Sequence, residues 1–185
     1  MPDGSHRRLD ALQIGDVVQA VDESTGKLVW SPVYMFFDAT TAATRDFLRI
    51  QLRSIKQGRL HMLHITPNHF VYAGPPASSS LAHARLVHAG TVHMGDTMWV
   101  RGEGGRVVES EVVDVERVPG RGLFSPHTLA GSIVVDGVMA HSSGDLALPG
   151  GRYLSTTLGI HPKVYFVSAG VCLSGWELRH MHGIP

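Results

Sequence analysis

The stretch "IGDVVQAVDESTGKLVWSPV", residues 14–33, is followed by a similar one, "MGDTMWVRGEGGRVVESEVV", at residues 94–113. Each has an apolar residue before a Gly-Asp pair, then a strand-like run, a glycine-bearing turn and a second strand-like run. The offset of about 80 residues is longer than the period of solenoid repeats. The pair of stretches therefore predicts one duplicated β-subdomain, with two halves related by pseudo-twofold symmetry.

The rest of the chain favours an all-β fold class. Short runs rich in Val, Ile, Phe and Tyr are broken by turn residues at intervals of roughly ten residues. Residues 22–27 and 101–106 both contain glycine and are predicted to form hairpin loops, because glycine readily adopts the positive φ of such turns. A helix-like start is found only at Ser80, a candidate cap before Leu81. The predicted strands are 17–21, 28–37, 47–53, 60–65, 69–73, 97–101, 106–118 and 132–138.

The overall composition limits the possible partners. The 185 residues carry 16 Lys and Arg against 16 Asp and Glu, so the net charge gives no reason to expect binding to nucleic acid or to an anionic membrane. The most apolar tract, residues 164–176, is shorter than the roughly 20 residues of a membrane span. The single cysteine, Cys172, predicts a small hydrophobic side chain rather than a nucleophile. We expect a monomer.

The stretch "HITPNHF", residues 64–70, is a candidate site. Pro67 biases Thr66 toward extended backbone, and Asn68 favours a turn, so Thr66 should end one strand and His69 should begin the next. One interpretation is a hydrogen-bonded turn with a half-buried histidine. The other is that His69 transfers a proton while the Thr66 hydroxyl binds a peptide group.

Asp38 is a second candidate, at the end of the predicted strand 28–37 and before a polar loop. An aspartate there often caps a turn. It could also take a proton from an incoming hydroxyl or orient a histidine.

The twelve histidines raise the question of a metal site. His61 and His64 are three positions apart, and strand alternation places them on opposite faces. His180 and His182 could share a face, but no third ligand is evident near them. We therefore expect neither a metal nor another cofactor.

Four blocks follow one another along the chain: the Gly-Asp strand, hairpin and aspartate of residues 4–38, "LHITPNHFVYAG", "VHMGDTMWV", and "GLFSPHTLAGSIVVDGVMAHSS". In this order they resemble the Hint domain of the Hedgehog family, a domain that inteins share. The similarity covers roughly residues 4–144 and implies a horseshoe of two β-subdomains. We expect a Hint domain at 1–148 and a C-terminal extension of unknown structure at 149–185. The last block favours Hedgehog proteins over inteins, because a closing His-Asn pair is absent.

The resemblance implies self-cleavage of a peptide bond through a cysteine thioester, with transfer of the upstream segment to a sterol or another hydroxyl. The partners would be the chain's own N-terminal precursor segment and the acceptor, in the secretory pathway or outside the cell. Thr66 and His69 would activate the scissile amide, His69 by protonating the leaving nitrogen, and Asp38 would deprotonate the acceptor.

The sequence departs from this family at the nucleophile. No cysteine precedes position 172, Ser5 lies in a turn, and Ser142 stands where many Hedgehog relatives have cysteine. We expect the chain to be inactive without an upstream cysteine, as a fragment or as a degenerate member. The alternatives are a non-catalytic β-domain that acts as a binding module and a serine esterase, for which no Gly-x-Ser-x-Gly motif is present.

Overall fold

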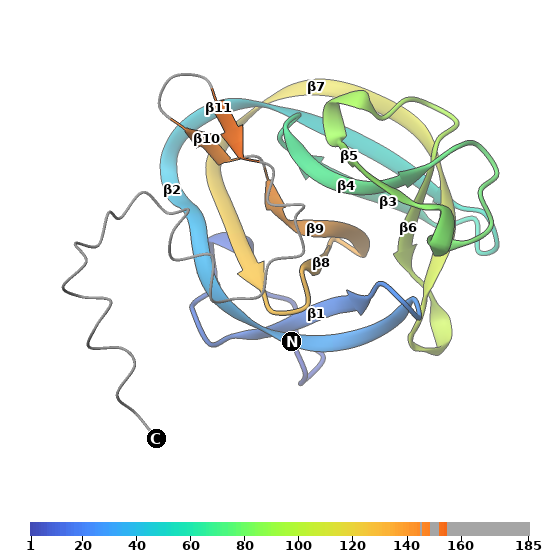
Figure 1. The fold of residues 1–185 in the computed structure, drawn as a ribbon, viewed down its shortest axis with the longest axis horizontal. Helices are drawn as coiled ribbons and strands as arrows, with labels where there is room; N and C mark the ends of the chain where they lie inside the picture. The colour runs from blue at the N-terminus through green and yellow to red at the C-terminus, as the bar shows by residue number, and fades with distance from the viewer. Residues whose placement is uncertain (145, 149–151, 155–185) are drawn as a thin grey trace. The chain divides into compact units, whose positions relative to one another are not determined.

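The computed structural model describes residues 1–144, 146–148 and 152–154. Its contacts divide the chain into two units, Met1–Asp145 and Leu146–Pro185. The described part contains strands and four short 3₁₀ turns but no α-helix, which confirms the all-β fold class (Figure 1). The elements are η1 (Leu9–Ala11), β1 (Val17–Asp22), β2 (Lys27–Ser54), β3 (Leu60–Ile65), β4 (His69–Gly74), η2 (Leu81–His83), β5 (Arg85–His88), η3 (Ala89–Thr91), β6 (Thr97–Arg101), η4 (Glu103–Gly105), β7 (Val107–Thr128), β8 (Ser132–Val135), β9 (Val138–Gly144), β10 (Leu146–Leu148) and β11 (Arg152–Leu154).

The first unit is a nine-stranded sheet in the order β1-β2-β7-β6-β4-β9-β8, with β3 added to β2 and β5 added to β4. In the second unit, β10 and β11 pair antiparallel. Among the described residues, no helix is long and apolar enough to cross a membrane.

Two long strands, β2 and β7, form the frame of the first unit. They pair antiparallel from Val33↔Thr128 to Ser54↔Ser110, with four register shifts along the way. Register shifts bend and twist a strand pair, and Figure 1 shows the two strands curving side by side around the unit. The predicted strands 28–37 and 47–53 are parts of the single strand β2. The prediction of a polar loop after Asp38 is therefore wrong. The register shifts allow β2 to remain paired with β7 in the segment where apolar and polar residues no longer alternate.

The duplicated stretches fold in the same way. Gly15 N donates to Val33 O at 2.8 Å, and Gly95 N donates to Val112 O at 2.8 Å. Both glycines have positive φ, 94° and 90°, a conformation that glycine adopts without a steric penalty.

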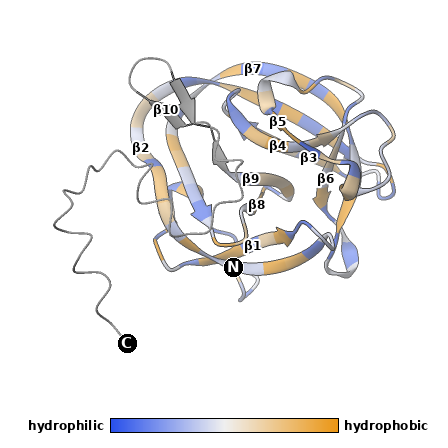
Figure 2. Cartoon of the chain, viewed as in Figure 1, coloured by the Kyte–Doolittle hydropathy of each residue, from blue (hydrophilic) through white to orange (hydrophobic). Residues whose placement is uncertain are grey.

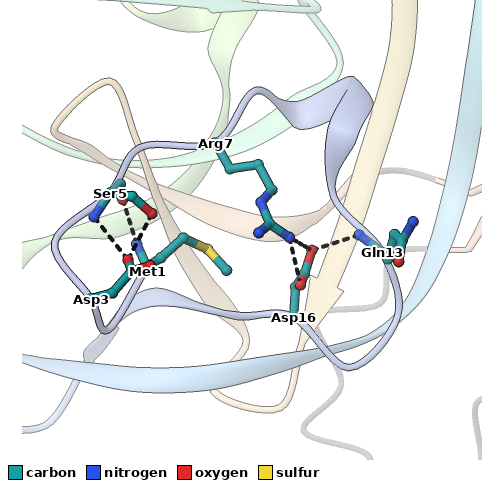
Figure 3. Close-up of polar contacts among 6 residues, drawn as sticks. All are labelled: Met1, Asp3, Ser5, Arg7, Gln13 and Asp16. Carbon is teal, nitrogen blue, oxygen red and sulfur yellow. Dashed lines mark hydrogen bonds and ion pairs between the residues drawn. The ribbon is translucent and has the colours of Figure 1, made fainter.

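The aspartate that follows each glycine also makes an equivalent contact. The Asp16 carboxylate accepts a bond from Gln13 N at 2.8 Å, as Figure 3 shows, and the Asp96 carboxylate accepts one from His93 N at 2.8 Å. The two Gly-Asp turns therefore have the same backbone hydrogen bonds, and each leads into a strand that pairs antiparallel with the next long strand: β1 with β2, and β6 with β7.

Other segments also differ from the prediction. The expected strand 132–138 is a hairpin of β8 and β9, turned at Asp136 and Gly137, which both have positive φ. An Asp-Gly pair between apolar runs is a strong hairpin signal. The Ser80 hydroxyl accepts a bond from Ala82 N at 3.2 Å, but it caps only the three residues of η2, and β5 follows.

The core of the first unit lies against its central strands. Every residue of β4 after His69 is buried, and β6 is buried until Arg101. By contrast, the middle parts of β2 and β7 are half-buried or exposed, and Figure 2 shows hydrophobic and hydrophilic residues along both strands. A strand buried on both faces is held rigidly by packing, so His69, at the start of β4, has a firmly placed backbone.

Candidate functional site

One cavity of about 340 Å³ brings the predicted site residues together. Asp38 on β2, Thr66 after β3 and His69 at the start of β4 all line it. The resemblance therefore pointed to three residues that share one cavity, although they span 31 positions of sequence.

The turn that carries Thr66 and His69 connects strands that do not pair with each other. Strand β3 pairs with β2, whereas β4 pairs with β5, β6 and β9. His69 N donates to Thr66 O at 3.0 Å, which closes the turn, and Gly90 N donates to Pro67 O at 2.8 Å. A Cβ on residue 90 would lie 3.2 Å from Pro67 O, so glycine permits this close approach.

The orientation of His69 is fixed by a hydrogen bond to β9. Its Nε2 lies 2.9 Å from His141 O. A carbonyl oxygen can only accept, so Nε2 carries the hydrogen and, in the neutral ring, Nδ1 carries the lone pair.

The environment of His69 favours the neutral ring. Desolvation lowers the pKa of His69, the bond to His141 O opposes that effect, and the charge of His141 lowers the pKa further. Desolvation is the largest of these causes, and burial disfavours a cation. At neutral pH the His69 ring is therefore uncharged and able to accept a proton at Nδ1.

Asp38 reaches the cavity from a bulge in β2. Phe36 pairs with Pro126 and Ala39 with Phe124, so Phe37 and Asp38 together lie opposite Ser125 alone. An extra residue of this kind re-aims side chains locally. The Asp38 side chain is exposed, and it lies within a continuous strand rather than at the strand end that the sequence predicted.

His127, on β7, is a nearby residue that the sequence reasoning missed. It is 5% exposed, its ring contacts those of Tyr34 and Phe37, and its Nε2 is buried without a hydrogen-bond partner. Desolvation and the charges of His69 and His141 lower the pKa of His127 to about 4. A histidine inside the apolar run "LFSPHTL" was the available signal.

Ser142, also lining the cavity, is the second residue that was not assigned a role. It is 3% exposed, and its amide donates to Gly131 O at 2.8 Å. Much of the remaining wall is apolar and includes Phe37, Phe47, Leu63, Leu123, Phe124 and Ile133.

A second cavity, of about 740 Å³, adjoins the first through shared lining residues, among them His64, Arg121 and Phe124. Its other walls include the N-terminal segment from Met1 to Leu12. That segment is held by an ion pair of 2.7 Å between Arg7 and Asp16 and by a bond of 2.8 Å from the Met1 amino group to Ser5 O (Figure 3). The Ser5 hydroxyl donates to the Asp3 carboxylate at 2.7 Å.

Two histidine pairs were candidate metal ligands in the sequence, His61 with His64 and His180 with His182. His61 lies against Gly137, whereas His64 lines the two cavities, so these residues face different surroundings. Within the part of the chain that the structure describes, no group of three His, Cys, Asp or Glu could hold a metal ion. His180, His182 and Cys172 lie outside the described residues.

Sequence comparison matches residues 1–146 to the family model described as the Hint module. Warthog protein 6 of Caenorhabditis elegans is 29% identical over 164 residues, which are 85% of this chain and 26% of that protein. Tiggy-winkle hedgehog protein of Danio rerio is 31% identical over 141 residues, 75% of this chain and 32% of that protein. The chain thus spans about a third or less of the length of these relatives.

Structural comparison gives the same fold. A DnaB intein from Synechocystis superposes with a TM-score of 0.58 at 14% sequence identity, covering 77% of this chain and 90% of the intein. The crystal structure of an intein from a hyperthermophile superposes with a TM-score of 0.54 at 18% identity. At these identities the likeness concerns the fold alone.

Proposed function

The chain belongs to the Hint module family, and from that premise we propose that it is the autoprocessing domain of a Hedgehog-type precursor. It would cleave the peptide bond on its N-terminal side through a thioester and pass the upstream segment to a sterol or another hydroxyl. The observation that supports this most strongly is that Asp38, Thr66 and His69, from three separate elements, line one cavity.

In the first step, a cysteine thiol attacks the preceding carbonyl carbon, a C–S bond forms and the C–N bond breaks. Neutral His69 takes the thiol proton at Nδ1 and delivers it to the departing nitrogen, which then leaves as an amine. The bond from Nε2 to His141 O supports this role because it leaves Nδ1 for the proton transfer. The Thr66 hydroxyl binds the scissile peptide group.

In the second step, Asp38 removes the proton of the incoming hydroxyl as its oxygen attacks the thioester carbonyl. The thiolate leaves and takes up a proton, so an ester replaces the thioester. The exposed position of Asp38 supports this assignment, because an acceptor that arrives from solvent can reach it. A sterol, another alcohol and water share the hydroxyl that this chemistry requires.

The nucleophile in this proposal is a cysteine on a strand joined ahead of Met1. The single cysteine of the sequence is Cys172, so we propose that the 185 residues do not cleave themselves. The second cavity supports this placement, because the N-terminal segment lines it and it shares His64, Arg121 and Phe124 with the cavity of the candidate site.

We also propose that the domain acts as a monomer in the secretory pathway. The three site residues come from one chain, which supports a site that needs no second copy. The similarity to hedgehog and warthog proteins supports the location.

The proposal can be tested with a precursor in which a reporter domain is followed by a strand that begins with cysteine and then by the full chain from Met1. Dithiothreitol should release the reporter by attacking the thioester. His69→Ala should slow this release at least about 100-fold, the lower range for loss of an acid–base group. Asp38→Ala should retain the thiol-induced release and lose transfer to an added alcohol. The outcomes are measured by gel densitometry and intact mass.

Two results would contradict the proposal. Release at an unchanged rate in His69→Ala would remove that residue from the first step. A folded precursor with an intact site that yields no thiol-dependent release would favour the binding-module alternative, in which Thr66 and His69 only shape a turn.

A further inference from the structure

Ser142 lies on β9, directly after the carbonyl group that holds His69. His69 Nε2 donates to His141 O at 2.9 Å, and the Ser142 amide donates to Gly131 O at 2.8 Å. These bonds fix the backbone of Ser142 relative to the imidazole. The side chain is 3% exposed and lines the same cavity as Asp38, Thr66 and His69.

Two of the other buried serines, Ser132 and Ser31, have hydroxyl groups that form hydrogen bonds to the backbone. The Ser132 hydroxyl donates to Val21 O and accepts from Val21 N, both at 2.8 Å. The Ser31 hydroxyl accepts from Ala130 N at 3.0 Å. Neither of these two serines lines the cavity, whereas Ser142 does.

A serine hydroxyl is a weak nucleophile unless a base removes its proton. His69 meets that need, since its Nε2 hydrogen is committed to His141 O and Nδ1 holds the lone pair. Burial favours the neutral ring, which is the form that acts as a base. The wall of the same cavity includes the apolar side chains of Phe47 and Leu123.

We propose that Ser142 is a catalytic residue that accepts the acyl group from a thioester in this cavity, with His69 as its base. The inference rests on the proposed acyl-transfer function. The Ser142 oxygen attacks the thioester carbonyl, a C–O bond forms and the C–S bond breaks. The hydroxyl proton passes to His69 Nδ1 and then to the departing thiolate, so the products are a seryl ester and a free thiol.

The purified 185-residue chain can be tested without a precursor. The probe is the acetyl thioester of N-acetylcysteamine, and the readout is intact mass followed by peptide mapping. We expect one acetyl group on the peptide that contains Ser142, with the rate of acetylation falling at least about 100-fold in His69→Ala. Ser142→Ala should not be labelled at this peptide. Ser125→Ala is the matched control, because Ser125 lines the same cavity, and it should be labelled at the wild-type rate.

Ser142→Cys guards against a folding defect, because it keeps an acceptor of similar size. It should take the acetyl group faster than wild type, since a thiolate is the better nucleophile. Absence of label from Ser142 in the folded wild-type chain, or equal labelling of Ser142 in His69→Ala, would overturn the inference. The proposed function is tested independently of this inference. Dithiothreitol should still release the reporter from a Ser142→Ala precursor, whether or not the thioester probe labels Ser142 in the wild-type chain.

Discussion

At the scale of single residues, burial keeps the imidazole rings in and near the site uncharged. His69 and His127 both have lowered pKa values, with desolvation as the largest cause. The turn around His69 could be predicted from sequence because Thr66, Pro67 and Asn68 act locally. The position of His127 close to the site could not be predicted from sequence, since it depends on the pairing of β7 with β2.

His127 should make the protein sensitive to acid. Its pKa is about 4 when folded against an ordinary value of 6.5. Below pH 6.5 the unfolded chain therefore binds more protons, and stability falls as the pH drops toward 4. The loss from His127 alone should be about 3 kcal/mol between pH 7 and pH 4. Urea unfolding at both pH values measures it.

The control compares two leucine variants. His127→Leu should lose much of this pH dependence and keep the part due to His69, whereas His83→Leu, at an exposed site on η2, should keep all of it. Equal pH dependence in His127→Leu and wild type would show that His127 is not buried as a neutral ring.

At the scale of elements, the long pair of β2 and β7 shapes the site. Asp38 was identified from its resemblance to a family position, but the reason given for its place, a strand end, was wrong. It reaches the cavity because a bulge sets Phe37 and Asp38 opposite Ser125. Sequence alternation does not reveal such a bulge, since the bulge depends on the register with Ser125, which lies 87 positions after Asp38.

Gly120 tests the same strand pair. A Cβ on this β7 residue would overlap the ring of Phe47 on β2, which lines the cavity. Gly120→Ala should therefore destabilise the fold by about 1–3 kcal/mol, as overpacking usually does. Chemical denaturation measures the loss. Adding Phe47→Leu should recover part of it, and strict additivity of the two changes would contradict the contact.

At the scale of the whole first unit, the duplication was visible in sequence because each turn repeats the same Gly-Asp pair between strand-like runs. Gly15 and Gly95 have matching positive φ, and Asp16 and Asp96 accept equivalent backbone bonds. The strand order was not visible. The placement of β4 between β6 and β9 depends on long-range pairing, and it is this pairing that brings His69 to His141 and Ser142.

The central claim is that Thr66 and His69 act as one unit on one bound peptide. The most direct test is the rate of thiol-dependent release from the precursor for Thr66→Val, His69→Ala and the double variant. Residues that act as a unit are strongly non-additive. We predict that the double variant is no slower than His69→Ala alone. Rate losses that multiply, with Thr66→Val costing as much in the absence of His69 as in its presence, would contradict the account.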